Sequence, residues 1–392
     1  MAGAVLLGLG SMVGTGVFVS LALAAGLAGA AVPWTVAIAA VVAMCNGLSS
    51  AQLAAANPVA GGTYEYGYRY LHPVAGLTAG WLFILAKSAS AATAALGIAA
   101  YAGLGARRLP ALAALVVVTV LVLMGIRRSN QANVLIVLLS VGALVAVSTA
   151  AWGEAWAAPT PAVGSFPDVA EAAALVFVAF TGYGRVATLG EEIRNPRTSI
   201  PRAVVATVVV TALLYVVVAF VLSRLGTGGL GDGSPLVAVA TAAGGGVLEA
   251  LVRAGALAAM VGVLLNLILG LSRVVLAMGR RRDLPAATAV IHRGGRTPTV
   301  AILSVAAVVA AFVLIGSIAV TWSFSALTVL VYYALTNLAA LRQPPEERRV
   351  PLAVQAVGLI GCLALAVFLE PVMWLWAAGL IAIGVIWHYI RR

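Results

Sequence analysis

Residues 2–30 read AGAVLLGLGSMVGTGVFVSLALAAGLAGA, a stretch without a charged side chain. It is longer than the roughly 20 apolar residues that an α-helix needs to cross a membrane. Gly10, Gly14 and Gly16 interrupt the stretch near its middle. Glycine tolerates the dihedral angles of a broken helix, and unwound backbone inside a membrane must line a space enclosed by protein. The stretch therefore predicts a broken membrane-spanning helix.

The composition of the whole chain also indicates a membrane protein. Of its 392 residues, 63% are hydrophobic and 9% are charged, and the mean hydropathy is +1.10. Soluble domains contain roughly 45–50% apolar and about 25% charged residues, so a soluble or a disordered chain is excluded. The apolar run 111–124 lacks the alternation of a membrane β-strand. We expect an all-α integral membrane protein with a single membrane domain.

Apolar runs between polar, proline and glycine residues predict about twelve membrane-spanning helices. Cys45 and Cys362 lie within apolar runs, so they suggest neither a disulfide framework nor a metal site, and no cofactor is expected. The expected spans are 3–30, 33–56, 73–104, 109–126, 130–152, 168–193, 199–226, 247–279, 298–316, 319–341, 350–369 and 371–390.

The arginines predict the orientation of the chain. If the N-terminus is cytoplasmic, basic residues in cytoplasmic loops outnumber those in external loops by roughly four to one, as the positive-inside rule requires. The external minority is Arg107, Arg108, Arg224 and Arg253. We expect a multi-pass protein of the cell membrane with both termini cytoplasmic. The net charge of +11 then reflects topology and calls for no nucleic-acid partner.

A second glycine-bearing interruption lies five spans after the first. The stretch AFTGYGR (179–185) places Gly182 and Gly184 within the sixth apolar run. Paired glycine interruptions at matching places of two halves point to the binding site of an inverted-repeat transporter. Each glycine alone is better explained by close helix packing, but the paired pattern favours a binding site.

Four motifs follow one another along the chain. They are GSMVGTGVF (10–18), NPVAGGTYEY (57–66) with a following Gly-Trp, FTGYGR…GEEIRNPRTSIPRA (180–203) and SRVVLAMGR (272–280). Because it carries these four motifs in this order, the chain resembles the amino acid–polyamine–organocation (APC) transporter superfamily over almost its whole length. The resemblance implies alternating access and broken helices 1 and 6. It also implies two inverted five-helix repeats, at 1–152 and 168–341, and two additional helices at 350–390.

The first interruption is expected to hold the two ends of a substrate. Unwinding exposes N–H groups at the start of a half-helix, whose partial positive charge suits a carboxylate. By the resemblance, Thr15 and Gly16, with Gly14 beside them, match positions that hold the carboxylate. Met12 and Thr181 match positions whose freed carbonyls accept the substrate's ammonium.

The second interruption supplies the remaining substrate-binding candidates. By the resemblance, the rings of Phe180 and Tyr183 would close over the substrate as aromatic gates, and Gly182 lies between them. Ordinary packing between helices is the alternative interpretation of both rings.

The loop 57–72 is expected on the cytoplasmic side. By the resemblance it is similar to an inner-gate loop in which Tyr64 and Glu65 contact neighbouring spans. An interfacial aromatic belt is the alternative interpretation of its tyrosines. Glu191 and Glu192, which precede two arginines, are interpreted as a salt-bridge cluster that stabilises the closed inner gate, not as a catalytic pair.

Two cations lie within the expected spans. Lys87 is near the middle of the third span, where a cation costs roughly 2.5–3.5 kcal/mol on insertion scales, so we expect it to face the protein interior. Burial disfavours its charged form, which makes it a candidate proton carrier or a core-structural residue. Snorkelling to an interface is the alternative, but Lys87 is too central to reach either interface easily. Arg185 follows the second interruption and would repel cationic substrates unless it is paired or turned away. Together they favour neutral or acidic amino acids.

The sequence also bears on the coupling ion. By the resemblance, sodium-independent relatives often carry a lysine in the fifth span at the place of a sodium ion, and here Ser140 matches that position. The eighth span has no serine or threonine between Gly255 and Gly270, where a sodium site would use hydroxyl groups. We therefore expect sodium-independent transport, with Lys87 as a substitute for the missing lysine.

The predicted function is secondary active transport of amino acids, driven by protons or by exchange, with neutral substrates favoured. Transport of a small amine or polyamine, or sensing of a substrate without transport, are the alternatives. A membrane enzyme would need paired histidines or clustered carboxylates within the spans, and we expect no catalytic residues. The expected partners are the substrate, membrane lipid and protons, and an accessory subunit is left open. The histidines, which lie in expected loops or near the C-terminal end, are His72, His292 and His388.

Overall fold

The computed structural model describes residues 2–57, 61–104, 108–125, 130–187, 196–226, 234–291 and 298–390. Within these ranges the regular structure is helical, apart from an isolated bridge between Gly29 and Val163. This confirms the expected all-α class. The α-helices are α1 (Ala2–Met12), α2 (Thr15–Ala28), α3 (Val32–Ala56), α4 (Thr63–Tyr70), α5 (Pro73–Ala99), α6 (Arg108–Leu123), α7 (Asn130–Ala150), α8 (Trp152–Ala157), α9 (Phe166–Phe180), α10 (Tyr183–Ala187), α11 (Pro196–Leu225), α12 (Pro235–Arg280), α13 (Thr299–Ile315), α14 (Ile318–Leu341), α15 (Leu352–Val367) and α16 (Pro371–Ile390).

The helices match the expected membrane spans in position. Within the described ranges, eight helices are long and apolar enough to cross a membrane, and the pair α1 and α2, bent by 50°, makes a ninth candidate. The shorter apolar helices α6, α13 and α15 occupy the other three expected ranges. A multi-pass membrane protein is confirmed, and the count of twelve spans stays a prediction.

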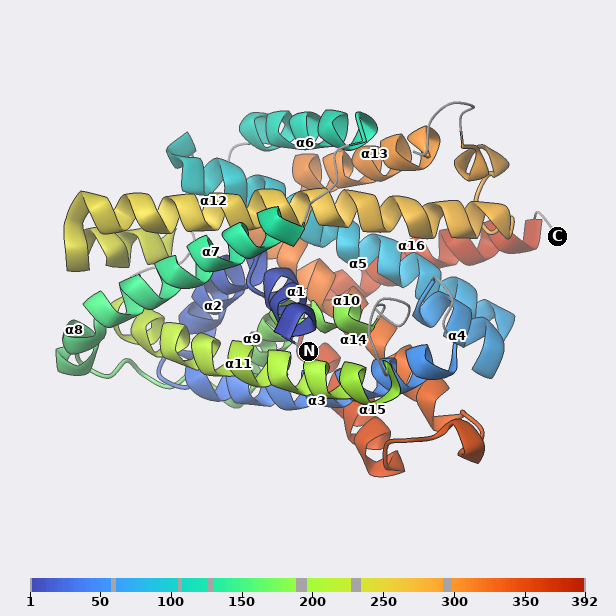
Figure 1. Ribbon diagram of the computed structural model, residues 1–392, viewed down its shortest axis with the longest axis horizontal. Helices are drawn as coiled ribbons and strands as arrows, with labels where there is room; N and C mark the ends of the chain where they lie inside the picture. The colour runs from blue at the N-terminus through green and yellow to red at the C-terminus, as the bar shows by residue number, and fades with distance from the viewer. Residues whose placement is uncertain are drawn as a thin grey trace.

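Helix α12 begins earlier than expected. The sequence predicted a span over 247–279, but the helix runs over Pro235–Arg280 and is interrupted at Gly245, where φ is 63° and ψ is −158°. Only glycine adopts such a backbone conformation readily, so residues before 245 form a separate helical arm. In Figure 1 this arm folds back at the left-hand end of α12.

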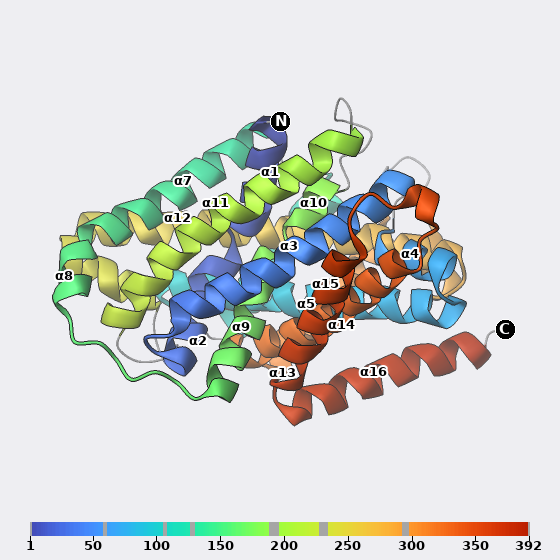
Figure 2. The ribbon, with the colours of Figure 1, turned by 90° about the horizontal axis from the view of Figure 1, so that it is seen from below.

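The two broken helices lie in the middle of the bundle. Figure 1 shows α1, α2, α9 and α10 between longer helices that run along the long axis of the molecule, and in Figure 2 the start of α1 lies at an edge of the bundle. Among the longer helices, α3 packs along α11, α5 along α14, and α7 along α12. Any unwound backbone of the broken helices is therefore enclosed by protein, as a membrane environment requires.

Burial separates inner helices from outer ones. Helices α5 and α14 are the most buried of the long helices and are joined by the hydroxyl pairs Ser90–Ser325 and Thr93–Thr321, each 2.7 Å apart. Such hydrogen bonds hold helices together where the hydrophobic effect between them is absent. The outer helices expose apolar residues, as a surface in contact with lipid does; examples are Leu135, Leu138, Ile360, Leu375 and Ile383.

The bundle has two chemically different ends. We call one the α4 end; it consists of α4, the residues Arg280–Asp283 at the end of α12 and just after it, and the linker residues Pro345–Glu347. In both ribbon views it lies on the right (Figures 1 and 2). The opposite end carries α8 and is called the α8 end. Arginines gather at the α4 end: Arg69, Arg280, Arg281, Arg282, Arg342, Arg348 and Arg349.

Candidate functional site

The first helix break is a sharp turn at Val13 and Gly14. The amide of Gly14 donates to the carbonyl of Met12 at 2.9 Å, and Gly14 has an extended backbone with φ −146° and ψ −144°. A Cβ atom at Gly14 would lie 2.5 Å from a methyl group of Val263 on α12, so this position favours glycine because of close packing. The break therefore occurs where the glycine pattern predicted it.

The second helix break lies directly against the first. Helix α9 ends at Phe180 and α10 begins at Tyr183. A Cβ atom at Gly182 would lie 2.5 Å from the carbonyl oxygen of Ser11, and one at Gly16 would lie 2.5 Å from the Cβ of Ala179. Two segments that the sequence separates by five spans thus touch backbone to backbone.

The start of α2 presents free polar groups at this contact. Gly14 is the N-cap, and no side chain caps the N–H groups of the first turn. These groups carry the partial positive charge of the helix dipole. The hydroxyl oxygen of Thr15 is buried and has no hydrogen-bond partner among the described residues. This arrangement can accept an anionic group such as a carboxylate.

Tyr215 on α11 joins the two breaks. Its hydroxyl donates to the carbonyl of Met12 at 2.7 Å and lies 3.5 Å from the carbonyl of Ala179. Its ring packs against the ring of Phe180, with centroids 5.2 Å apart. The Met12 carbonyl, which the resemblance assigned to the substrate's ammonium, therefore accepts hydrogen bonds from both Gly14 and Tyr215.

Lys87 on α5 reaches the second break. Its ammonium donates to the hydroxyl of Thr181 at 2.9 Å, and that hydroxyl donates to the carbonyl of Val178 at 2.8 Å. The side chain faces the protein interior, as the cost of a cation in lipid predicts. It therefore links the third expected span to the unwound part of the sixth.

The two aromatic gate candidates are fully buried. Phe180 packs on Tyr215, and Tyr183 packs on Tyr333 of α14, with ring centroids 5.4 Å apart. Such pairs contribute packing energy beyond the area they bury. Arg185, by contrast, is exposed, so it does not share the buried environment of these rings.

The fifth and eighth expected spans meet at Ser140. Its hydroxyl donates to the carbonyl of Gly255 at 3.0 Å. A Cβ atom at Gly255 would lie 2.9 Å from the Cβ of Ala143, so α7 and α12 approach closely here. The hydroxyl and the carbonyl thus form a direct hydrogen bond with each other.

The gate candidates at the α4 end contact the end of α12. The hydroxyl of Tyr64 donates to Asp283 at 2.6 Å, and Glu65 forms an ion pair with Arg281 at 2.9 Å. Tyr64 and Glu65 thus contact the segment that follows α12, and the gate role of loop 57–72 stays a prediction. Glu191 and Glu192 lie outside the described residues.

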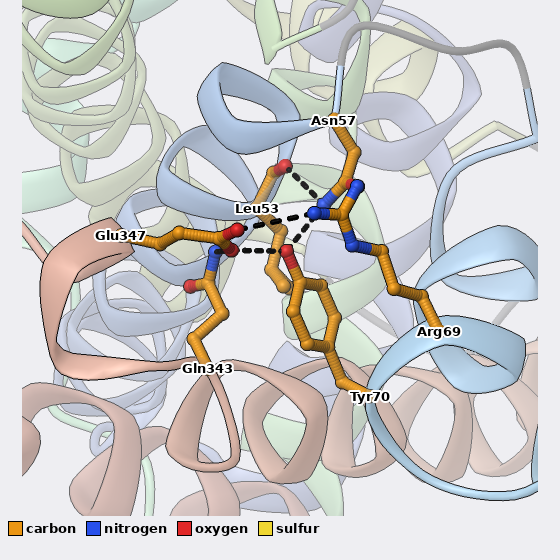
Figure 3. Close-up of polar contacts among 6 residues, drawn as sticks. All are labelled: Leu53, Asn57, Arg69, Tyr70, Gln343 and Glu347. Carbon is orange, nitrogen blue, oxygen red and sulfur yellow. Dashed lines mark hydrogen bonds and ion pairs between the residues drawn. The ribbon is translucent and has the colours of Figure 1, made fainter.

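A polar network joins α4 to α3 and to the linker after α14 (Figure 3). Arg69 forms an ion pair with Glu347 at 3.1 Å and a hydrogen bond with Asn57. Tyr70 accepts a hydrogen bond from Asn57 at 2.7 Å and donates one to Glu347, which Gln343 also contacts at 3.4 Å. Three chain segments that are distant in sequence are therefore held together at the α4 end.

Three residues of these sites were missed by sequence reasoning. Tyr215 stands alone in a valine-rich span and reads as a packing residue. Asp283 follows a run of arginines and reads as solvated. His388 was noted only as lying near the C-terminal end. The one available signal was a polar side chain within an apolar run, which applied to Tyr215 but not to Asp283.

Two broken helices that meet inside an α-helical bundle are the architecture of a membrane transporter. Comparison of the sequence with known proteins supports the same class. The family described as Amino acid permease matches residues 3–390. An uncharacterized transporter of Mycobacterium tuberculosis is 41% identical over 395 residues, which cover 99% of this chain and 90% of the relative.

Two relatives from Bacillus subtilis carry more specific names. A branched-chain amino acid permease is 29% identical over 330 residues, covering 76% of this chain and 70% of the relative. A methylthioribose transporter is 26% identical over 422 residues, covering 98% and 91%. The chain belongs to the amino acid permease family of the APC superfamily, as the motifs predicted. The family and the names of these relatives support a multi-pass membrane transporter of amino acids.

Proposed function

We propose that the chain moves a neutral amino acid across the cell membrane by alternating access, without sodium, driven by protons or by exchange. The observation that carries the proposal is the close contact between the two broken helices, where Gly182 lies against the backbone of Ser11 and Gly16 lies against Ala179. It brings together the two sets of unwound polar groups that would hold a substrate. The repeats 1–152 and 168–341, with the two helices 350–390, are part of this proposal.

The start of α2 is the proposed carboxylate site. The uncapped first turn and the unpartnered hydroxyl of Thr15 offer donors to an anion. The ammonium would approach the carbonyls of Met12 and Thr181, which requires it to share or displace the Tyr215 hydroxyl on Met12. Phe180, Gly182 and Tyr183 complete the proposed site.

Lys87 supports sodium independence. Its ammonium donates to Thr181 at the second break, so the protonated side chain supplies a positive charge there from within the chain. At the place that the resemblance assigns to a sodium ion, the Ser140 hydroxyl instead donates to the carbonyl of Gly255, so these two oxygen atoms bond to each other. Proton binding and release at Lys87 is the proposed coupling step.

The charge of Lys87 is the main support for a preference for neutral substrates. A protonated Lys87 beside the site repels a second positive charge. Arg185 is exposed and contributes less to this argument than the sequence suggested. The name of the branched-chain amino acid permease is compatible with a neutral substrate.

Uptake by the purified protein in liposomes tests the proposal. Labelled leucine should accumulate at equal rates in sodium and potassium buffers, and an inward proton gradient or preloaded unlabelled amino acid should accelerate it. Binding without accumulation or exchange would leave a sensor. Uptake of amines or polyamines instead of amino acids would overturn the proposed substrate class.

Lys87→Met separates the role of its charge from packing. The substitution keeps the length of the side chain, and we expect uptake to lose most of its dependence on pH. Thr149→Val on α7 is the matched control because, within the described ranges, the Thr149 hydroxyl bonds to carbonyls of its own helix. An unchanged pH profile in Lys87→Met would exclude Lys87 as the proton carrier.

A further inference from the structure

A buried carboxylate at the α4 end joins three helices. Asp283 is 2% exposed and lies directly after α12. A buried carboxylate is strongly unfavourable unless hydrogen bonds or opposite charge compensate it. Both of its oxygen atoms have partners. We call the group the Asp283 cluster; its members are Asp283, Tyr64, Tyr68, Glu65, Arg281 and His388.

Helix α4 binds one oxygen of this carboxylate twice. The hydroxyls of Tyr64 and Tyr68 donate to Oδ2 of Asp283 at 2.6 and 2.7 Å. These residues are four apart, so they lie on the same face of α4. Burial, and then the hydrogen bond to Asp283, raise the pKa of Tyr64 well above its usual range, so the hydroxyl stays a donor.

Arg281 also contacts α4, through the rings of both tyrosines and through Glu65. Its guanidinium lies 4.2 Å from the ring centroid of Tyr68 and 5.3 Å from that of Tyr64, and it pairs with Glu65. Cation–π contacts of this kind are attractive and strengthen when shielded from water. The position of α4 is therefore defined by polar contacts with the end of α12.

The C-terminal helix supplies the third partner. Nδ1 of His388 lies 3.0 Å from Oδ1 of Asp283, and its side chain is 4% exposed. An ionised carboxylate only accepts hydrogen bonds, so Nδ1 carries the proton of this bond and Nε2 remains free to gain a second. His388 is also in the last turn of α16, where the helix dipole favours a cation.

The titratable and charged side chains around His388 come from α4, from the end of α12 and from α16. Asp283, after α12, and Tyr389 of α16 contact His388 directly. On the other side of Asp283 lie Tyr64 and Tyr68 of α4, with the ion pair of Arg281 and Glu65 beside them. Helices α5 and α14 also pack against α16, and no titratable side chain described on them bonds to His388. In the sequence, Arg391 and Arg392 follow.

We propose that His388 is a proton-responsive positioning residue, which through Asp283 holds α4 in place more tightly when it is protonated. Protonation converts a neutral donor into an imidazolium, so the hydrogen bond to the ionised carboxylate gains the attraction between two opposite charges at short range. Histidine is the side chain whose charge ordinarily changes between about pH 5 and 8. Acidification at this end of the protein would then restrain the gate segment. The link to gating rests on the proposed transport function, whereas the restraint of α4 does not.

Hydrogen exchange of the full-length protein in lipid nanodiscs tests the restraint without any substrate. After correction for intrinsic rates, amides of Thr63–Tyr70 should exchange roughly fivefold more slowly at about pH 5.5 than at about pH 7.5, because the protonated pair is stronger. His388→Asn retains a donor near Nδ1 but does not titrate, and it should abolish the difference. Asp283→Asn should abolish it as well.

His72→Asn is the matched control. His72 is the N-cap of α5 and accepts from the amide of Val74, a role that asparagine fills well. This variant should keep the full pH response. No response in the wild-type protein, or an equal response in His388→Asn, overturns the proposal. Failed uptake by the wild-type protein would overturn the transport function and leave the exchange result standing.

Discussion

At the scale of single residues, Tyr215 connects the two helix breaks. Its hydroxyl donates to the carbonyl of Met12 in α1 and lies 3.5 Å from that of Ala179 in α9, and its ring packs on Phe180. A buried carbonyl that loses its donor retains the penalty of desolvation. The hydroxyl of Tyr215 therefore defines the relative position of Met12 and Ala179 in this conformation.

Replacing Tyr215 with phenylalanine keeps the ring and removes the hydroxyl. We expect the free energy of unfolding to fall by about 1–2 kcal/mol, because the buried carbonyl of Met12 loses a donor. Thermal unfolding of the detergent-solubilised protein measures the change. Tyr389→Phe, at a position that is 62% exposed, is the control and should have no effect. Equal stability of the two variants would contradict the bridging role.

A second residue-scale prediction concerns Gly182. Alanine at this position places a methyl group against the backbone of Ser11 and Met12, which no side-chain movement can relieve. Overpacking of this kind costs typically about 1–3 kcal/mol, and uptake should be lost together with stability. Gly142→Ala on α7 meets no atom within 4 Å and should behave as the wild type. A Gly182→Ala protein with normal stability and uptake would show that the contact is dispensable.

At the scale of elements, the end of α12 has an unusual cap. The amide of Asp283 donates to the carbonyl of Met278, and that of Arg282 donates to Gly279, which together form a Schellman motif. The left-handed position of this motif usually holds glycine, but here Arg282 occupies it with φ 67°. The cap turns the chain so that Asp283 points into its cluster.

Arg282→Gly should therefore stabilise the protein. Relief of the left-handed strain contributes about 1–2 kcal/mol, and the greater freedom of glycine in the unfolded chain offsets roughly half of this. The expected net gain is a rise in the midpoint of thermal unfolding. Arg280→Gly, inside the last turn of α12, is the opposite control and should lower the midpoint. A lower midpoint for Arg282→Gly would contradict the strain argument.

At the scale of the whole molecule, the arginines make orientation testable. We expect the α4 end to be cytoplasmic. A membrane-impermeant maleimide applied to intact cells should label Gly153→Cys, which is exposed on α8, but should label Glu346→Cys in the linker only after permeabilisation. The native Cys45 and Cys362 lie within helices of the bundle, and the parent protein measures their background. Labelling with the opposite pattern would reverse the topology.

The sequence predicted those parts of the structure that depend on local composition. Helical spans follow from apolar runs, the break at Gly14 follows from its glycines, and the inward orientation of Lys87 follows from the cost of a cation in lipid. The contacts of Tyr215 and Asp283 could not be predicted in this way. Tyr215 and Met12 are 203 residues apart, and Tyr64 and Asp283 are 219 apart, so their pairing depends on the tertiary arrangement.

The tight contact between the two breaks has a mechanical consequence. Gly16 and Gly182 bring main chain against main chain, so no side chain lies between the segments to change rotamer and absorb a displacement. Close-packed contacts of this kind transmit movement rather than damping it. The cores of the two broken helices must therefore travel as one rigid body. Any hinge has to lie at the outer halves, α1 and α10, or in the helices that surround them.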